Sequence, residues 1–151
     1  MVKEISLIIP SQDAETNLVN LLKSIPDWVV YPNEIIVIDS SKKKFLIPED
    51  FKTFTKKHDI KLIITHGKRF YPGHARNIGI SKSSNSLLAF LDTSTYPSKS
   101  WLSSSLDIMS SENTEGVWGN TYYEADKYFP KIFRASTYGA KSIKTFPGSI
   151  L

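Results

Sequence analysis

Polar side chains that could bind a phosphorylated ligand recur directly after short apolar runs of the sequence. Asp39 and Asp92 each follow such a run, and Arg76 lies on the segment between them. A guanidinium can pair with phosphate oxygens through two parallel hydrogen bonds, and a carboxylate can accept hydrogen bonds from sugar hydroxyls or coordinate a divalent cation. The candidate residues that share these positions are Pro10, Ser11, Asp39, Ser40, His66, His74, Arg76, Asp92, Thr93 and Ser94.

Each of these candidates also has a purely structural interpretation. Asp39 could form an Asx-turn with the loop that it begins, and Asp92 could organise the turn into the next helix. Arg76 could be a surface residue or a salt-bridge partner on its helix, while His66 and His74 could be ordinary polar surface. Their joint placement along one edge of the fold favours a ligand site.

The apolar runs predict four strands that are covered on both faces. They are continuous rather than alternating, which is typical of a parallel sheet. The carboxyl ends of parallel strands meet at one edge, and ligands bind there at the point where the strand order reverses. The predicted strands are Ile5–Ile9, Ile35–Ile38, Leu62–Ile64 and Leu87–Leu91.

Helical signals lie between the predicted strands. Asp13 is the expected N-cap of a first helix that Pro26 ends. The apolar stripe of this helix consists of Leu18, Leu21, Leu22 and Ile25. Further helices are expected over Glu49–Lys57, from about Gly73 to Lys82, and from near Pro97 onward. The alternation of strands and helices predicts an α/β layered fold in a single domain over residues 1–151.

Composition and missing motifs exclude several classes of protein. The 151 residues include no cysteine, so thiol catalysis is excluded, and the first strand is not followed by the glycine-rich dinucleotide-binding motif. Neither a Walker A motif nor a nucleophile elbow is present. A net charge of +4 without a nucleic-acid-binding motif indicates no nucleic-acid partner. No apolar run approaches the ~20 residues of a membrane span, so we expect a cytoplasmic protein, with peripheral membrane association left open.

Four segments, taken in order, resemble the family 2 glycosyltransferases of GT-A fold, which transfer a sugar from a nucleotide-diphosphate donor. They are Ile5–Ile25, Glu34–Ser41, Gly73–Ile80 with its Ala-Arg-Asn-x-Gly pattern, and Phe90–Leu102 at the position of the family's D-x-D motif. The resemblance implies a Rossmann-related sandwich, in which helices flank a mostly parallel central sheet.

The resemblance also implies roles for the candidate residues. Pro10 and Ser11 would lie beside the nucleoside, and Asp39 would shape the base and ribose pocket with Ser40 next to it. Arg76 would lie near the diphosphate. Asp92, followed by Thr93 and Ser94, would face the donor sugar and the metal site. Further candidates for phosphate contacts are Lys68, Arg69 and His74.

Two departures from the family pattern bear on a metal cofactor. Ser40 replaces the second acidic residue after the second strand, and Ser94 replaces the second Asp of D-x-D. Mg²⁺ or Mn²⁺ prefers anionic oxygen ligands, so a metal site at Asp92 alone should be weakened. Lys68, Arg69 or Arg76 could neutralise the departing diphosphate instead.

The expected function is a glycosyltransferase that uses a UDP- or GDP-sugar and an unknown carbohydrate, lipid or protein acceptor. The resemblance implies inversion at the anomeric carbon. The attacking hydroxyl needs a general base, and no catalytic base is identified: Glu124 and Asp126 are interpreted as surface residues. We therefore expect the chain to be a donor-binding part that lacks a C-terminal acceptor half, and the apolar end Pro147–Leu151 indicates truncation.

Two other interpretations stay open. The chain could be a nucleotide-sugar-binding module without catalysis, in which Ser40 and Ser94 mark lost function. It could also be an interaction domain or a homo-oligomer that uses an aromatic surface. Around the expected strand or hairpin at Val117–Gly119 and Tyr122–Tyr123, that surface would comprise Trp118, Tyr122, Tyr123, Tyr128 and Phe129.

Overall fold

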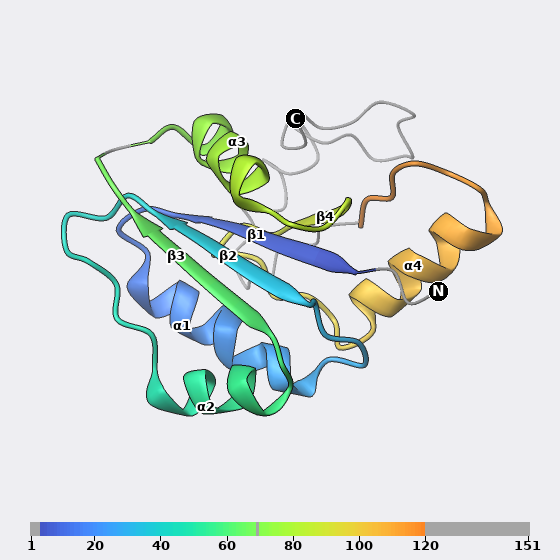
Figure 1. Cartoon of the computed structure of the whole chain (residues 1–151), viewed down its shortest axis with the longest axis horizontal. Helices are drawn as coiled ribbons and strands as arrows, with labels where there is room; N and C mark the ends of the chain where they lie inside the picture. The colour runs from blue at the N-terminus through green and yellow to red at the C-terminus, as the bar shows by residue number, and fades with distance from the viewer. Residues whose placement is uncertain (1–3, 69, 120–151) are drawn as a thin grey trace, which may run out of the picture.

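The computed structural model describes residues 4–68 and 70–119, and its framework is a four-stranded sheet (Figure 1). Neighbouring strands are all parallel and are ordered β3-β2-β1-β4. The strands are β1 (Ile5–Ser11), β2 (Glu34–Asp39), β3 (Lys61–His66) and β4 (Leu87–Phe90). This arrangement confirms the predicted α/β class and the four predicted strands.

Helices cover both faces of the sheet, with α1 and α2 on one side and α3 on the other (Figure 1). Leu7 and Ile9 of β1 pack with α1 and α2, whereas Ile8 packs with Ala75 of α3. Successive side chains of a strand point to opposite faces, which is why the strands had to be continuously apolar. The helices are α1 (Glu15–Ser24), the short 3-10 helix η1 (Ile25–Asp27), α2 (Glu49–Lys57), α3 (Pro72–Lys82) and α4 (Trp101–Ser111).

The strand order defines where a ligand site is expected. From β1 the chain moves outward through β2 to β3, and β4 then pairs on the other side of β1. The direction of winding therefore reverses between β1 and β4. The carboxyl ends of these two strands diverge there, with Pro10 and Ser11 at the end of β1 and Asp92, Thr93 and Ser94 in the loop after β4.

The prediction that Asp13 is the N-cap of the first helix is wrong. The N-cap is Ala14, without a side-chain capping bond, and Asp13 has a left-handed backbone with φ of 48°. The Asp13 carboxylate instead accepts the backbone N–H of Lys42 at 3.0 Å. The Asp13 side chain thus binds the neighbouring loop and does not cap the helix, as the sequence pattern had predicted it would.

Two predictions near the end of the described chain also need correction. The last helix begins at Trp101 rather than near Pro97, because the segment before it turns, with the Thr95 N–H bonded to the Asp92 carbonyl at 2.9 Å. Residues 117–119 have no regular structure where a strand was expected. Tyr122 and Tyr123, the other half of that expected hairpin, lie outside the described residues.

Helix α3 lies so close to β1 that only glycine fits at position 79. A Cβ at Gly79 would overlap the side chain of Ile8, which is fully buried in the central strand. We expect Gly79→Ala to lower the free energy of unfolding by about 1–3 kcal/mol, because the helix or the strand must shift. Urea unfolding would measure this change.

Gly73 provides a matched control on the same helix. A Cβ at Gly73 meets nothing within 4 Å. Gly73→Ala should therefore leave stability unchanged or raise it by up to about 1 kcal/mol. Equal effects of the two substitutions would contradict the close approach at Gly79.

None of the helices within residues 4–68 and 70–119 has both the length and the apolar character needed to cross a membrane.

Candidate functional site

An open cleft of about 240 Å³ lies where the strand order reverses. It draws on β1, the loop after β2, the start of α3 and the loop after β4. Seven of the predicted donor-binding residues are in its wall. The lining comprises Pro10, Ser11, Gln12, Ser40, Phe70, Pro72, Ala75, Arg76, Asp92, Thr93 and Ser94.

An ion pair between Arg76 and Asp92 crosses the cleft from α3 to the loop after β4. The guanidinium Nη2 donates to Asp92 Oδ1 at 2.5 Å. The Arg76 side chain is 11% exposed and that of Asp92 is 50% exposed, so the helix and sheet enclose the cation while the anion reaches solvent. The pair explains why two residues sixteen positions apart lie together at this edge.

Arg76 keeps unused hydrogen-bonding capacity in this arrangement. Its Nε is buried and has no hydrogen-bond partner among the described residues. A buried N–H without an acceptor costs roughly 1–3 kcal/mol, and more for a charged group. An anionic ligand in the cleft would therefore meet a guanidinium that the protein has only partly satisfied.

Asp39 lies at the same sheet edge but is not in the cleft wall. It is fully buried, and its Oδ2 bonds to Nδ1 of His66 at 2.9 Å and to the N–H of Phe45 at 3.3 Å. Oδ1 accepts both the N–H and the hydroxyl of Ser41, at 3.2 and 2.5 Å. Burial by itself would raise the pKa of Asp39, but the donors on Ser41, His66 and Phe45 together hold that pKa below its ordinary value.

The backbone bond from Ser41 makes an Asx-turn, one of the two interpretations that the sequence left open. Asp39 therefore organises the loop after β2, while its neighbour Ser40 lines the cleft. A direct role of Asp39 toward a donor stays a prediction.

Of the three further candidates for phosphate contacts, Lys68 and His74 are not in the cleft wall. Lys68 and His74 are exposed. The His74 ring packs against Phe70, with 5.3 Å between ring centroids, so it touches the cleft only through that neighbour. Arg69 lies outside the described residues.

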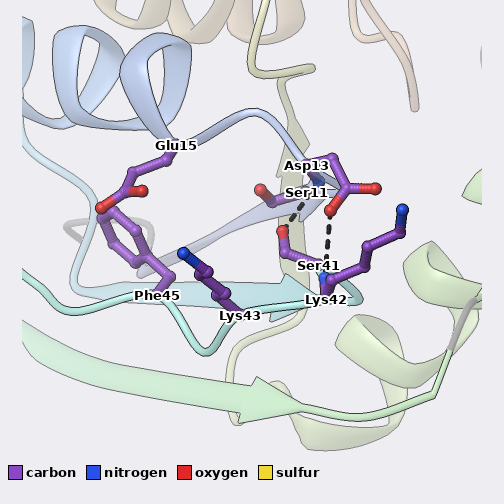
Figure 2. A pocket seen from close by; sticks show the side chains of 7 residues that line it. All are labelled: Ser11, Asp13, Glu15, Ser41, Lys42, Lys43 and Phe45. Carbon is purple, nitrogen blue, oxygen red and sulfur yellow. Dashed lines mark hydrogen bonds between the residues drawn. The ribbon is translucent and has the colours of Figure 1, made fainter.

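A second hollow of about 290 Å³ adjoins the cleft, and sequence reasoning did not identify it. Ser11 lines both hollows. Figure 2 shows Ser11 at the end of β1 and Asp13 from the following loop facing Ser41 and Lys42 from the loop after β2. The remaining lining residues are Glu15, Lys43 and Phe45. The sequence offered one signal for this hollow: its two loops follow the first and second predicted strands, and the ends of neighbouring parallel strands lie at the same edge of a sheet.

Gln12, Phe70, Pro72 and Ala75 are also in the cleft wall and were not among the predicted site residues. Gln12 directly follows the predicted residues Pro10 and Ser11, which was an available signal. The other three residues line the cleft because α3 and the segment before it lie close to the sheet, and the local sequence pattern does not predict that distance.

The residues in the cleft do not fit a divalent metal ion held by the protein alone. Among the described residues, no three His, Asp or Glu side chains come together as a metal-binding group. Asp92 is the one carboxylate among the described residues of the cleft lining, and Arg76 already neutralises it. Thr93 and Ser94 add only neutral hydroxyls, which are weak ligands for Mg²⁺ or Mn²⁺.

Solved structures of similar fold are GT-A glycosyltransferases. Residues 1–349 of S. aureus TarS in complex with UDP-GlcNAc are 19% identical with a TM-score of 0.57, over 80% of this chain and 37% of that chain. The mannosyltransferase PcManGT from Pyrobaculum calidifontis, in complex with GDP-Man and Mn²⁺, is 19% identical with a TM-score of 0.56, over 70% of this chain and 32% of PcManGT. The backbone therefore has the GT-A fold that the sequence motifs implied.

Sequence comparison agrees with the fold. Glycosyltransferase AglE of Haloferax volcanii is 28% identical over 122 residues, which is 79% of this chain. The chain spans 40% of the length of AglE. The family model described as glycosyl transferase family 2 matches residues 6–146. The four motifs, the parallel sheet and this match agree, and the chain belongs to glycosyl transferase family 2.

Proposed function

We propose that this chain binds a nucleotide-diphospho-sugar in the cleft between β1 and β4, as the donor part of a glycosyltransferase. The Arg76–Asp92 pair at the reversal of strand order carries the proposal, because it combines a partly satisfied cation with a solvent-facing acceptor. Membership of glycosyl transferase family 2 supports it. So does the second hollow, which adjoins the cleft at Ser11 and could take another part of an elongated ligand.

The two charged residues have distinct proposed roles. When the bond between the anomeric carbon and the diphosphate breaks, negative charge grows on the leaving phosphate oxygens. The Arg76 guanidinium would stabilise that charge, using donors that the protein leaves unpaired. The exposed oxygen of Asp92 would accept a hydrogen bond from a ribose or donor-sugar hydroxyl. Ser11 and Pro10 would contact the nucleoside side of the ligand, where the two hollows meet.

The acceptor chemistry belongs to another part of the site. An inverting transfer needs a base on the face opposite the leaving group to take the proton of the attacking hydroxyl. Asp92 is the one carboxylate among the described cleft residues, and it is already paired with Arg76. Glu124 and Asp126 lie outside the described residues. We propose a carbohydrate, lipid or protein hydroxyl as the acceptor.

Donor binding should depend little on a divalent metal ion. Arg76 meets the charge of the diphosphate, since the described part of the cleft offers a metal ion one carboxylate, which is already paired. We expect UDP, GDP or one of their sugars to bind the chain, with a Kd that changes less than about threefold between Mn²⁺ and EDTA. Isothermal titration calorimetry with each nucleotide would measure it.

Two results of that titration would count against the proposal. Absence of heat and of any thermal shift with every nucleotide would refute donor binding by this chain. Binding that disappears in EDTA and returns with Mn²⁺ would refute the assignment of the diphosphate charge to Arg76. Inorganic pyrophosphate, titrated alongside, separates recognition of the phosphates from recognition of the nucleoside.

A nucleotide-sugar-binding module without catalysis is the second candidate function. The hydroxyls of Ser40 and Ser94 in the cleft lining favour it, since the family pattern has acidic residues there. Hydrolysis of the bound donor, followed by chromatography of the released nucleotide, distinguishes the two candidates. Turnover supports the transferase, whereas tight binding without turnover supports the module.

A further inference from the structure

One serine hydroxyl joins the two loops that border both hollows. The N–H of Asp13, in the loop after β1, donates to Ser41 Oγ at 2.8 Å (Figure 2). The same hydroxyl donates to Oδ1 of the buried Asp39 at 2.5 Å. A second bond between the loops runs from the Lys42 N–H to Asp13 Oδ1 at 3.0 Å.

These bonds fix Ser11, the residue that the two hollows share. Ser11 ends β1, and its carbonyl accepts the backbone N–H of Ser40 at 2.9 Å. The chain then leaves the sheet, and the next contact that holds it against the β2 loop is the one between Asp13 and Ser41. Residues 11–13 are thus held to the neighbouring loop at both ends.

The hydrogen bond from the Ser41 hydroxyl to Asp39 is stronger than an ordinary surface hydrogen bond, because its acceptor is a charged carboxylate. Asp39 is fully buried, and hydrogen bonds to a carboxylate are roughly twice as strong as bonds between neutral groups. His66 and Phe45 bind the other oxygen of the same carboxylate, so Asp39 cannot turn away to another partner. The anchor of the loop contact is therefore rigid.

We infer that Ser41 is a positioning residue for the nucleotide, which sets the separation of the two loops without needing to touch the ligand's phosphates. This inference rests on the proposed function. Loss of the hydroxyl should free the loop after β1, and the ligand would then have to order Ser11 and Gln12 as it binds. Ordering two residues on binding costs affinity rather than fold stability.

The test is a calorimetric titration of the whole 151-residue chain with UDP and with GDP, at a temperature well below unfolding. We expect Ser41→Ala to raise the Kd of the better nucleotide about tenfold. Ser41→Thr keeps the hydroxyl and should restore the Kd to within about threefold of wild type. Both substitutions alter side-chain packing, but only threonine keeps the hydroxyl. Rescue by threonine therefore assigns the effect to the hydrogen bonds of the hydroxyl and not to packing.

Ser103→Ala is the matched control, since it removes a hydroxyl that bonds only locally on α4, to the Ser100 carbonyl at 3.0 Å. It should leave the Kd within about twofold of wild type. If Ser41→Ala does not fold, Asp13→Gly tests the connection between the same two loops through its other hydrogen bond, from the Lys42 N–H to Asp13 Oδ1. It suits the left-handed backbone at this position, removes the acceptor for Lys42, and should weaken binding about threefold.

The outcomes distinguish the inference from the proposed function. Wild-type binding together with an unchanged Kd for Ser41→Ala overturns the inference and leaves the donor site standing. Weakened binding that threonine does not restore also overturns it. A wild-type chain that binds neither nucleotide overturns the proposed function and the inference with it.

Discussion

Replacing Arg76 with glutamine is expected to weaken nucleotide binding about 100-fold, the largest effect on the proposed function of any single substitution. The guanidinium is enclosed by α3 and the sheet, lines the cleft and retains an unpaired Nε donor. Two charge-assisted hydrogen bonds to a diphosphate, each contributing about 1.5 kcal/mol, account for a change of this size. Calorimetry with UDP, GDP and pyrophosphate would measure it.

The same substitution should affect stability less than binding. Asp92, the partner left behind, is half exposed, so water can solvate its carboxylate once the guanidinium is gone. Lys82→Gln is the matched control, because it removes the same charge from the exposed last turn of the same helix. If both variants weaken pyrophosphate binding equally, general electrostatic attraction rather than Arg76 holds the anion.

Glu34 is the most consequential residue for stability outside the site. It begins β2 at the opposite end of the sheet, is 1% exposed, and accepts the hydroxyl of Ser6 at 2.7 Å. The N–H and hydroxyl of Ser84 donate to it at 3.0 and 2.9 Å, and Lys61 pairs with it at 2.8 Å. One carboxylate thus joins β1, β2, β3 and the segment that leads into β4.

Glu34→Gln is expected to lower the free energy of unfolding by about 3 kcal/mol near neutral pH. Burial alone would raise the pKa of Glu34, but the hydrogen bonds from Lys61, Ser6 and Ser84 prevail and lower the pKa from 4.5 to about 2. The unfolded chain therefore takes up the proton first as the pH falls. The stabilisation is complete above about pH 4.5 and is lost progressively toward pH 2.

Urea unfolding of both proteins at several pH values would check this. The difference between wild type and Glu34→Gln should be largest near neutral pH and should shrink as the pH approaches 2. Glu49→Gln removes an exposed carboxylate paired with Lys52 on α2, and should change stability by less than about 1 kcal/mol. A difference for Glu34→Gln that is independent of pH would show that the ionised carboxylate is not what stabilises the strands.

The strands, most of the helix positions and the general place of the site followed from the sequence. Continuous apolar runs identified β1 to β4, but the expected burial on both faces holds for β1 and β2, whereas β4 is half-buried and β3 is half-buried or exposed. The stripe from Leu18 to Ile25 is fully buried, as its spacing predicted. Polar residues directly after the strands had to gather at the carboxyl edge once the sheet was parallel, and Ser40, Asp92, Thr93 and Ser94 line the cleft there.

The sequence did not reveal which acidic side chain faces the cleft and which is enclosed by the protein. Asp39 and Asp92 have the same local signature, yet Asp39 is fully buried and Asp92 is half exposed. The partners of these two residues lie elsewhere along the chain: His66 is 27 positions from Asp39, and Arg76 is 16 positions from Asp92. The local sequence pattern predicts strands and helices from their periodicity. The ionisation and accessibility of a carboxylate depend instead on hydrogen-bond donors that come within about 3 Å only when the chain folds.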